Sequence, residues 1–462
     1  MRPLRLAIIL ALGASAPFAV AQTEKPSAPS AQTVANHRPA GATAEQVRAE
    51  FLHAWNAYKQ YAWGHDELKP LSRSYHDWYG VSLYITPVDA LDTMVLMGFA
   101  NEANETRELI AQNLSFDKDI EVKTFEITIR MLGGLLSSYQ LTGDKRLLTL
   151  AADLGNRLLP AFNSPTGMPY VYVNLKTGKT RGSESNPAEI GSLLIEFGTL
   201  SKLTGNPIFY DKAKRALLEL YTRRSKIGLV GSAINVESGR WTDTTSHISG
   251  GIDSYYEYLL KASILFDDKD CERMWKSSEQ AVDQYLADTS HGGLWYRHVN
   301  MNTGKPTSTH YAALDAFFPA VMARSGDLDR ARRALESSYK VWTTFNVEPE
   351  EIDYSNFKII HAGYMLRPEI MESAYYLSSY TKDARYKEMA STFIAGLVRY
   401  CKIESGYASL RSVNSMEKAD HMESFFLAET LKYLYLTFAS PETLELNEVV
   451  FNTEGHPIRK TW

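Results

Sequence analysis

The feature that most constrains the fold of this chain is a turn that recurs between apolar helical stretches. Clear copies read YQLTGDKRLL, SKLTGNPIFY, LFDDKDCERM, ARSGDLDRAR and SYTKDARYKEM, and each offers an Asp or Asn suited to cap the following helix. These residues are Asp144, Asn206, Asp268, Asp327 and Asp383, at spacings of 62, 62, 59 and 56 residues. Weaker copies at Asn101 and Ser440 bring the number of turns to seven.

A period of this length is typical of stacked helical hairpins, which form either an open solenoid or a closed ring. The connections before the first helix of each hairpin are long and rich in Gly, Pro and polar residues. Loops gathered at one end of a ring are suited to build a functional site. The sequence therefore predicts an all-α closed barrel of seven helical hairpins with a functional end made of loops.

Each hairpin also places one unexpected polar residue before its turn. In FEITIRMLGG, Glu126 lies 18 residues before Asp144 in an otherwise apolar stretch. At about 1.5 Å rise per residue, groups at such offsets lie near the same end of their helices and would converge on the barrel axis. A carboxylate is tolerated there if it faces a polar pocket. The seven residues are Asp89, Glu126, Glu189, Asp253, His310, Glu369 and Glu423.

A purely structural role is the alternative for each of these residues. A Glu in the first turn of a helix commonly serves as a cap or complements the helix dipole. Arg130 follows Glu126 by four residues, so the pattern alone indicates a structural ion pair between them. The coincidence across the repeat nevertheless favours a shared pocket.

Residues 1–21 have the pattern of a secretory signal peptide, with Arg2 and Arg5 before an apolar run that closes on an A-x-A site at Ala21. Residues 22–45 are rich in Pro, Ala, Ser and Thr and are predicted to be a flexible linker. No later stretch is long enough to span a membrane. We therefore expect an exported protein, periplasmic or secreted, with one catalytic domain over residues 46–462.

The charge and the cysteine content argue against two kinds of function, nucleic-acid binding and a cysteine-based zinc site. The net charge of −5 over 462 residues is mild and no block of like charges stands out, which argues against nucleic acid as a partner. Cys271 and Cys401 are the only cysteines; they cannot form a cysteine-based zinc site, and the sequence leaves open whether they pair. A ring of carboxylates suits glycoside hydrolysis, cation binding by oxygen ligands, or passive sugar binding.

Several segments stand in a familiar order from about residue 51 to residue 457. They are YKQYAWGHDELKPLS, DALDT, FEITIRMLGGLLS, DSYYEYLLK, LRPEIMES, MESFFLAETLKYLYL and VFNTEGHP. Together they resemble the class I α-mannosidases of glycoside hydrolase family 47. The resemblance implies an (α/α)7 barrel and a calcium-dependent, inverting exo-α-mannosidase. The expected substrate is α-1,2-linked mannose in an oligosaccharide or glycoprotein glycan, and the expected state is a monomer.

The resemblance also implies roles for individual residues. Glu126 corresponds to the proposed general acid, Asp253 to a second candidate for the acid, and Glu369 to the proposed general base. Thr453 corresponds to the residue whose carbonyl and hydroxyl oxygens hold calcium. The remaining positions implied to bind substrate are Arg130, Glu189, Arg367, Glu372, Phe425, Glu429 and His310.

The chain departs from the family pattern at identifiable places. An Asp-His pair is replaced by Ala312 and Ala313, so His310 is an expected stand-in, and Gly251 occupies a position where ER-type enzymes carry Arg. YAWGHDELKPLS is closer to the processing branch, whereas RRSKIGLVGSAINVESGRW is closer to the branch that marks misfolded glycoproteins for degradation. We expect VFNTEGHP to enter the barrel and plug the end opposite the substrate mouth. The alternatives are a non-catalytic mannose-binding protein on the same barrel and a helical-barrel glycosidase for another sugar.

Overall fold

The computed structural model describes residues 41–462. The predicted signal peptide and the predicted linker up to residue 40 lie outside these residues. The first helix begins at Ala44, where the Thr43 side chain accepts a hydrogen bond from the Gln46 backbone N–H, so the fold starts slightly before the boundary predicted at Gln46. Within the described range, no helix combines the length and the apolar character needed to cross a membrane.

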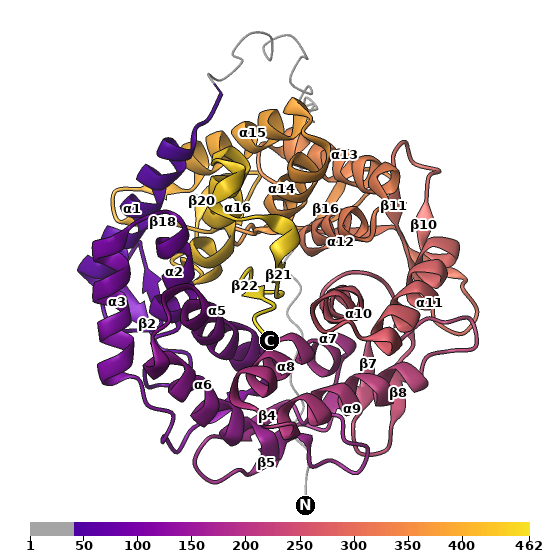
Figure 1. The fold of residues 1–462 in the computed structure, drawn as a ribbon. Helices are drawn as coiled ribbons and strands as arrows, with labels where there is room; N and C mark the ends of the chain where they lie inside the picture. The colour runs from indigo at the N-terminus through magenta and orange to yellow at the C-terminus, as the bar shows by residue number, and fades with distance from the viewer. Residues whose placement is uncertain (1–40) are drawn as a thin grey trace, which may run out of the picture. The chain divides into compact units, whose positions relative to one another are not determined.

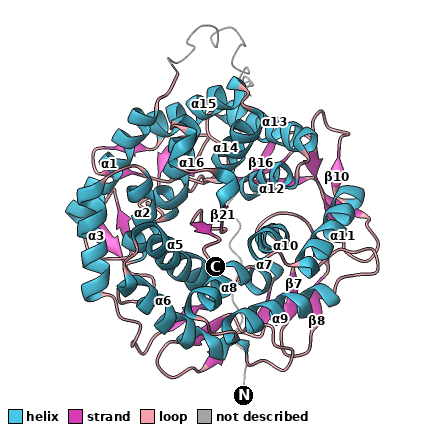
Figure 2. Ribbon diagram, in the orientation of Figure 1, coloured by secondary structure: helices cyan, strands magenta, loops and turns pink. Residues whose placement is uncertain are grey.

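Two concentric rings of helices form the barrel (Figures 1 and 2). The inner helices are α2 (Ile85–Leu96), α5 (Gly133–Thr142), α8 (Leu194–Thr204), α10 (Asp253–Phe266), α12 (Phe318–Ser325), α14 (Glu369–Thr381) and α16 (Leu431–Phe438). The outer helices are α3 (Ala100–Asn113), α6 (Lys145–Leu158), α9 (Ile208–Thr222), α11 (Lys269–Tyr285), α13 (Leu328–Phe345), α15 (Ala384–Tyr400) and α1 (Ala44–Tyr61). The prediction of seven helical pairs in a closed ring is confirmed.

The seventh helical pair is made of different helices from those predicted. Ser440 caps only a short 3₁₀ turn, η5 (Pro441–Thr443), and no outer helix follows it. The partner of α16 is instead α1, from the start of the folded chain. The ring is therefore closed by packing the first helix against the last. The turn assigned to Asn101 was also misplaced, because Asn101 lies inside α3 and Phe99 occupies the cap position.

Four of the predicted capping residues act as expected. The side chains of Asp144, Asp268, Asp327 and Asp383 each accept a hydrogen bond from a backbone N–H in the first turn of the next helix. Asn206 accepts from the Ile208 N–H at 3.2 Å, one residue outside the cap position of α9. Satisfying these N–H groups stabilises the start of each outer helix by about 1 kcal/mol.

Short helical segments extend several inner helices toward the loop end. They are α4 (Thr124–Ile127), the π-helical η1 (Thr128–Leu132), α7 (Pro187–Gly191), the 3₁₀ turn η3 (Ala313–Phe317) and the π-helical η4 (Phe426–Thr430). The remaining 3₁₀ turns are η2 (Leu159–Phe162) and η6 (Leu446–Glu448). The π-helical turns were not predicted, and both lie beside cavity residues described below, as such turns often do at functional sites.

Small antiparallel sheets join the loops at this end. In each three-stranded sheet, a strand that precedes an inner helix pairs with a strand that follows an outer helix. These sheets are β3 (Glu121–Lys123), β4 (Tyr172–Asn174), β5 (Thr180–Arg181); β6 (Glu184–Ser185), β7 (Ala233–Asn235), β8 (Arg240–Asp243); β9 (Thr245–Ser246), β12 (His298–Asn300), β13 (Pro306–Ser308); and β14 (His310–Ala312), β15 (Glu351–Asp353), β16 (Lys358–His361). The two-stranded sheets are β1 (Glu67–Lys69), β2 (Ser74–His76); β10 (Ala287–Asp288), β11 (Trp295–Tyr296); β17 (Lys402–Ile403), β18 (Gly406–Tyr407); β19 (Leu410–Ser412), β20 (Glu417–Lys418); and β21 (Val449–Phe451), β22 (Pro457–Arg459).

The hairpin β21–β22 lies inside the ring (Figure 1), as predicted for VFNTEGHP. Its turn is held by Asn452, whose Nδ2 donates to the Ile129 carbonyl at 2.8 Å and to Glu196 Oε1 at 2.7 Å. Gly133 permits this approach, since a Cβ there would lie 2.5 Å from Asn452 Nδ2. The sequence alone offers no reason for a glycine at this position, and the close approach of the hairpin explains it.

Buried charges also fasten the hairpin to the barrel. Lys432 Nζ donates to the Gly455 carbonyl at 2.5 Å and lies 2.8 Å from Asp92, whose side chain, like that of Lys432, is fully buried. His456 Nδ1 is 2.7 Å from the other Asp92 oxygen. Removing one partner from such a network leaves an uncompensated buried charge, which typically costs about 3–5 kcal/mol.

Candidate active site

A cavity of about 270 Å³ opens among the N-terminal ends of the inner helices, above the C-terminal hairpin. A larger hollow of about 520 Å³ lies near the ends of α14 and α16, but its carboxylates Asp383 and Glu445 are exposed. The smaller cavity is the candidate active site because buried carboxyl groups converge on it. Its charged or polar lining residues are Glu126, Arg130, Asn186, Glu189, Asp253, Ser254, Arg367, Glu369, Glu429, Thr453 and Glu454.

The structure brings together most of the residues expected from the sequence. Of the seven polar residues of the repeat, four line the cavity: Glu126, Glu189, Asp253 and Glu369. Of the residues implied by resemblance alone, Arg367, Phe425, Glu429 and Thr453 line the same cavity, as does Arg130. Glu372 lines a small adjoining cavity that also contains Asp253, Glu369 and Thr453.

Three of the seven repeat residues lie elsewhere. Asp89 is fully buried behind the cavity, 3.4 Å from His456 Nε2 of the C-terminal hairpin. His310 is in β14, where its Nδ1 lies 2.8 Å from Glu351, and it is not among the cavity-lining residues. Glu423 is buried beside His421 and does not line the cavity.

Glu126 and Arg130, the two charged residues in an otherwise apolar helical stretch, form an ion pair. The Nε of Arg130 donates to Glu126 Oε2 at 3.2 Å, and its Nη1 donates to Glu454. Burial alone would lower the pKa of Arg130, but the carboxylates of Glu454, Glu126 and Asp89 raise it well above its usual range. Arg130 therefore stays charged, and its guanidinium is paired with the carboxylates of both Glu126 and Glu454. The predicted ion pair is present, and both of its members also face the cavity.

Asp253 has a different environment from Glu126. It is the first residue of α10, and its Oδ1 accepts a hydrogen bond from the Ser254 N–H at 2.8 Å. Burial raises the pKa of Asp253 to about 7, with a smaller contribution from the charge of Glu257. Asp253 is consequently a carboxyl group that can hold a proton near neutral pH.

Glu369 is the first residue of α14 and follows the Arg367–Pro368 step. Burial raises the pKa of Glu369 to about 7, while the charge of Arg367 opposes this shift. Arg367 is fixed by Glu350, whose Oε2 accepts from its Nε at 3.1 Å and from its Nη2 at 3.0 Å. One Glu369 oxygen, Oε2, is buried without a hydrogen-bond partner in the described part of the chain. A buried, unpaired carboxylate oxygen is available for a water or a substrate group.

The floor of the cavity suits a hard cation. Thr453 lines this cavity together with the carboxylates Glu369, Glu429 and Glu454. Burial raises the pKa of Glu429 well above its usual range, and the charges of Glu454, Glu369 and Glu372 raise it further. This mutual repulsion, together with a donor set made only of oxygens, is what an oxygen-preferring divalent ion would relieve. The residues present therefore fit a calcium ion at Thr453.

Sequence reasoning missed two charged residues of the site. Glu350 holds Arg367, and it lies in the loop VEPEEIDY, where nothing in the pattern distinguishes it from its acidic neighbours. Glu454 pairs with Arg130 and follows Thr453 directly, so its position next to the implied metal ligand was the signal that could have identified it. The two cysteines take no part in the site, since Cys271 and Cys401 are both buried free thiols.

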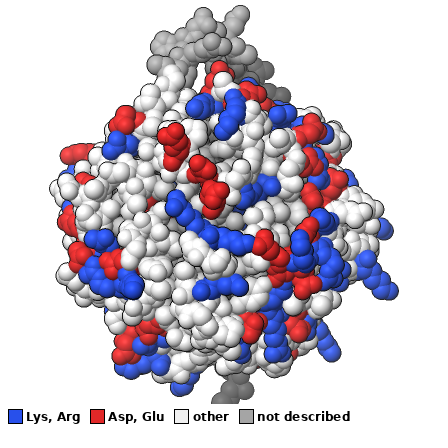
Figure 3. Space-filling model, in the orientation of Figure 1, with Lys and Arg blue, Asp and Glu red and all other residues white. Residues whose placement is uncertain are grey.

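Gly251 lines the cavity with a φ of +91°, a backbone conformation that side chains with a Cβ rarely adopt. The nearest atoms to a Cβ placed there would belong to Asn186, at 3.8 Å. Space is therefore available at this edge of the cavity, but an Arg would also require a different backbone. Lys, Arg, Asp and Glu are interspersed over the face of the molecule shown in Figure 3.

Comparisons with known proteins agree over nearly the whole described chain. The family model described as glycosyl hydrolase family 47 matches residues 50–460. Alpha-mannosidase I MNS5 of Arabidopsis thaliana is 40% identical over 446 residues, covering 90% of this chain and 76% of the plant protein. ER degradation-enhancing alpha-mannosidase-like protein 2 of Mus musculus is 37% identical over 449 residues, covering 90% of this chain and 77% of the mouse protein. The solved structure of the alpha-1,2-mannosidase from Trichoderma reesei matches with a TM-score of 0.83 at 29% identity, covering 90% of this chain and 98% of that one.

Proposed function

This chain belongs to glycosyl hydrolase family 47, and we propose that it is a calcium-dependent, inverting exo-α-mannosidase that removes α-1,2-linked mannose from mannose-containing glycans. The observation that carries the proposal is the convergence of Glu126, Asp253 and Glu369 on one cavity. Carboxyl groups in different environments are what glycoside hydrolysis requires, because one must donate a proton while another stays ionised.

Asp253 is our proposed source of the proton. Its raised pKa of about 7 leaves a substantial protonated fraction at neutral pH, whereas Glu126 is paired with the adjacent guanidinium of Arg130. Asp253 would protonate the oxygen of the leaving group. Glu126 would then orient a water or a sugar hydroxyl next to that oxygen, with Arg130 holding its carboxylate in place.

Glu369 is our proposed general base. Burial raises the pKa of Glu369 to about 7 and the charge of Arg367 opposes this shift, so a substantial fraction of Glu369 is ionised at neutral pH. Its unpartnered Oε2 atom can then accept a proton from the attacking water. In an inverting enzyme this water attacks from the ring face opposite the leaving group. Phe425 supplies an aromatic face beside both Arg130 and Arg367, against which an apolar face of a sugar ring can pack.

Thr453 is our proposed calcium ligand, through its hydroxyl and carbonyl oxygens, with the carboxylates of Glu429 and Glu454 nearby. When bound, the ion would supply positive charge and binding sites for sugar hydroxyls at the cavity floor. The N-terminal pattern supports export through a signal peptide. We take the protein to act as a monomer, which size-exclusion chromatography would check.

Incubation with α-1,2-, α-1,3- and α-1,6-linked mannobiose, with and without calcium, tests the proposal directly. We expect release of mannose from the α-1,2-linked disaccharide in calcium and none after chelation. Equal cleavage of all three linkages would contradict the linkage preference. No cleavage of any of them, by folded protein in calcium, would contradict the proposed activity.

A further inference from the structure

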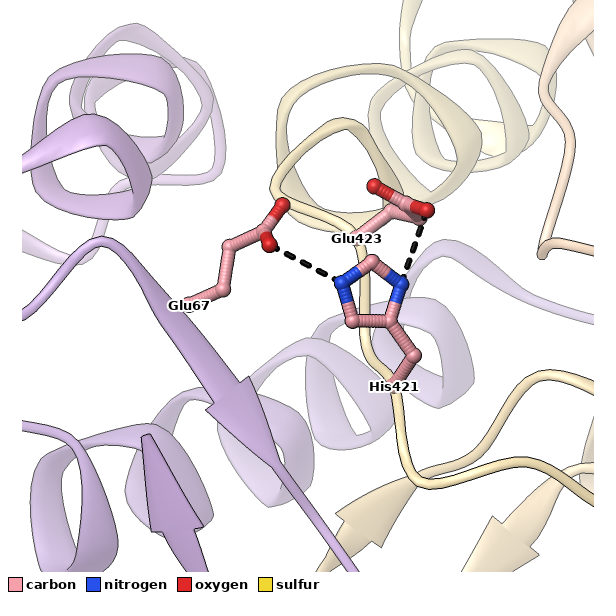
Figure 4. Close-up of side chains that lie close together, drawn as sticks. All are labelled: Glu67, His421 and Glu423. Atoms are coloured by element: carbon pink, nitrogen blue, oxygen red, sulfur yellow. Dashed lines mark hydrogen bonds and ion pairs between the residues drawn. The ribbon is translucent and has the colours of Figure 1, made fainter. Parts of the chain in front are cut away.

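A charged triad lies beside the candidate active site without lining it. His421 stands between two carboxylates (Figure 4). Its Nε2 is 2.9 Å from Glu67 Oε2, and its Nδ1 is 2.8 Å from Glu423 Oε1. An imidazole can donate to two carboxylates only when both ring nitrogens carry protons, so the geometry describes an imidazolium held between two anions.

The triad joins distant parts of the chain. Glu67 belongs to β1, near the start of the fold, whereas His421 and Glu423 precede η4, near its end. A β-bridge between Leu68 and Met422 fixes the two backbones side by side. The Glu67 and Glu423 side chains are 1% and 9% exposed, so neither charge is compensated by bulk water.

The same three side chains could be considered as ligands of a metal ion, since their donor atoms lie within 4.8 Å of one another. However, the two carboxylates contact different nitrogens of the ring, so each nitrogen already has an acceptor (Figure 4). Hydrogen bonds to Glu423 and Glu67 raise the pKa of His421 to about 10, whereas a metal ligand must be deprotonated. The arrangement therefore favours an ion triad over a metal site.

Glu423 connects the triad to the cavity. Its carboxylate contributes to raising the pKa of two cavity residues, Arg130 and Arg367. Both guanidinium groups also lie 5.7 Å from the ring centroid of Phe425, two residues after Glu423. Each arginine has its own carboxylate partners as well: Glu126 and Glu454 for Arg130, and Glu350 for Arg367. Glu423 is thus a further anion that acts on two arginines already engaged in the site.

We propose that His421 is a positioning residue: its positive charge holds Glu423 in place and, through Glu423, fixes the two arginines that flank Phe425 in the active-site cavity. Without the imidazolium, Glu67 and Glu423 would be two buried anions with no cation between them. Glu423 would then attract Arg130 and Arg367 more strongly, in competition with Glu126 and Glu350. Small displacements of such groups lower the rate of the chemical step more than they change substrate affinity.

The test uses variants that separate charge from shape. His421→Gln removes the charge, and His421→Lys retains a cation at the same position. His76→Gln is the control, since His76 Nδ1 is 3.7 Å from Glu67 Oε2 and its side chain is 53% exposed. Because activity as a readout rests on the proposed function, kcat and KM for α-1,2-mannobiose are measured together with the unfolding midpoint of each variant.

For His421→Gln we expect kcat/KM to fall at least about tenfold, mainly through kcat, in protein that remains folded. His421→Lys should recover part of this loss, and His76→Gln should behave as the wild type. The proposal is overturned if His421→Gln keeps the wild-type kcat, if it loses only thermal stability, or if the Lys variant is no better than the Gln variant. Binding of Zn²⁺ by the wild type, lost in His421→Gln, would also overturn it in favour of a metal site.

A wild type that cleaves no mannobiose would contradict the proposed function and leave the positioning role to be decided structurally. Crystal structures of the two His421 variants then provide the readout. We expect Arg130 and Arg367 to be displaced in His421→Gln and restored in His421→Lys. Unmoved guanidinium groups in His421→Gln would overturn the inference.

Discussion

Arg130 Nε donates to the carboxylate of Glu126, one helical turn earlier, at 3.2 Å, and both side chains line the same cavity. The same guanidinium donates to Glu454 of the C-terminal hairpin. One arginine therefore links an inner helix, the hairpin inside the barrel and a carboxylate of the cavity. This coupling means that the hairpin contributes to the electrostatics of the site as well as occupying the interior of the barrel.

Removal of either key carboxyl group should abolish turnover without unfolding the protein. Glu126→Gln and Glu369→Gln preserve size and remove the ionisable group. We expect kcat to fall by at least about 100-fold in each, because Glu369 is the proposed base and Glu126 orients the group next to the leaving oxygen. Initial rates on α-1,2-mannobiose, with circular dichroism to check folding, provide the measurement.

The control for these variants is Glu404→Gln, because the Glu404 side chain is 87% exposed and pairs only at the surface with Arg73. It should retain wild-type activity. Near-normal rates in both Glu126→Gln and Glu369→Gln would show that the carboxylates have been assigned wrongly.

The first product should have the inverted anomeric configuration. Inversion requires the acid and the base to be about 6.5–9.5 Å apart, which leaves room for a water between the base and the sugar. Proton NMR during the first minutes of reaction distinguishes β-mannose from α-mannose. Initial α-mannose would indicate retention, and with it a nucleophile that the present assignment lacks.

Asp253 should make both activity and stability depend on pH. Its pKa is raised to about 7 in the fold, above the value of an unfolded Asp, so the folded state binds the proton more tightly. The stability from this proton is fully present below about pH 4 and is lost as the pH rises through about 7. Above about pH 7 kcat/KM should fall because the general acid Asp253 is ionised, and below about pH 7 kcat/KM should fall because the general base Glu369, whose pKa is also raised to about 7, is protonated.

Asp253→Asn removes the titration and provides the check. In metal-free protein, we compare the free energy of unfolding of the variant with that of the wild type at each pH. The difference, variant minus wild type, should be larger at pH 8 than at pH 4 by at least about 1 kcal/mol, which corresponds to a shift of about one pKa unit. Urea unfolding at the two pH values measures this difference. An equal effect of the substitution at both values would show that the Asp253 pKa is not raised by folding.

Gly251 should leave the outer part of the substrate site open. It lines the cavity, and a Cβ placed there would meet nothing closer than Asn186 at 3.8 Å. We therefore expect little discrimination among the branches of a high-mannose glycan. Mass spectrometry of a timed digest would show several isomers disappearing together, whereas a digest that stops after one specific mannose would count against this expectation.

The sequence predicted the barrel because its turns repeat and its caps are chemically explicit. Asp144 and Asp383, for example, each follow an apolar helix and cap the outer helix that comes next. The same logic failed at Ser440, since the local pattern resembles the other turns but the outer helix is supplied by α1. Ring closure is a tertiary effect, and no local signal records which end of the chain completes the seventh pair.

The site was predicted in part for similar reasons. A helical offset placed Glu126, Glu189, Asp253 and Glu369 at one end of the barrel, and all four line the cavity. The offset could not show that Asp89 would face the hairpin instead, because that depends on the C-terminal segment entering the ring. Glu350 and the two π-helical turns depend on loop packing, for which the repeat gives no information.

Thr453 should govern calcium dependence. Its side chain lines the cavity floor, and its backbone N–H donates to the Tyr258 hydroxyl at 3.3 Å, so the loop is held by contacts that do not involve the Thr453 hydroxyl. Thr453→Ala and Thr453→Val remove that hydroxyl and keep the carbonyl. The Val variant also preserves the shape of the side chain. Thr453→Ser keeps both oxygens and serves as the matched control.

Chelation should abolish activity in the wild type, and added calcium should restore it, because the anionic floor needs a cation to hold sugar hydroxyls. Thr453→Ala and Thr453→Val should each need at least about tenfold more calcium for half-maximal activity, the scale expected for loss of about 1.4 kcal/mol of binding free energy. Thr453→Ser should resemble the wild type, and the unfolding midpoints without calcium should differ little. Activity that survives chelation and exhaustive dialysis, or an unchanged calcium requirement in both the Ala and Val variants, would mean that Thr453 is only a loop residue and that the metal role is wrong.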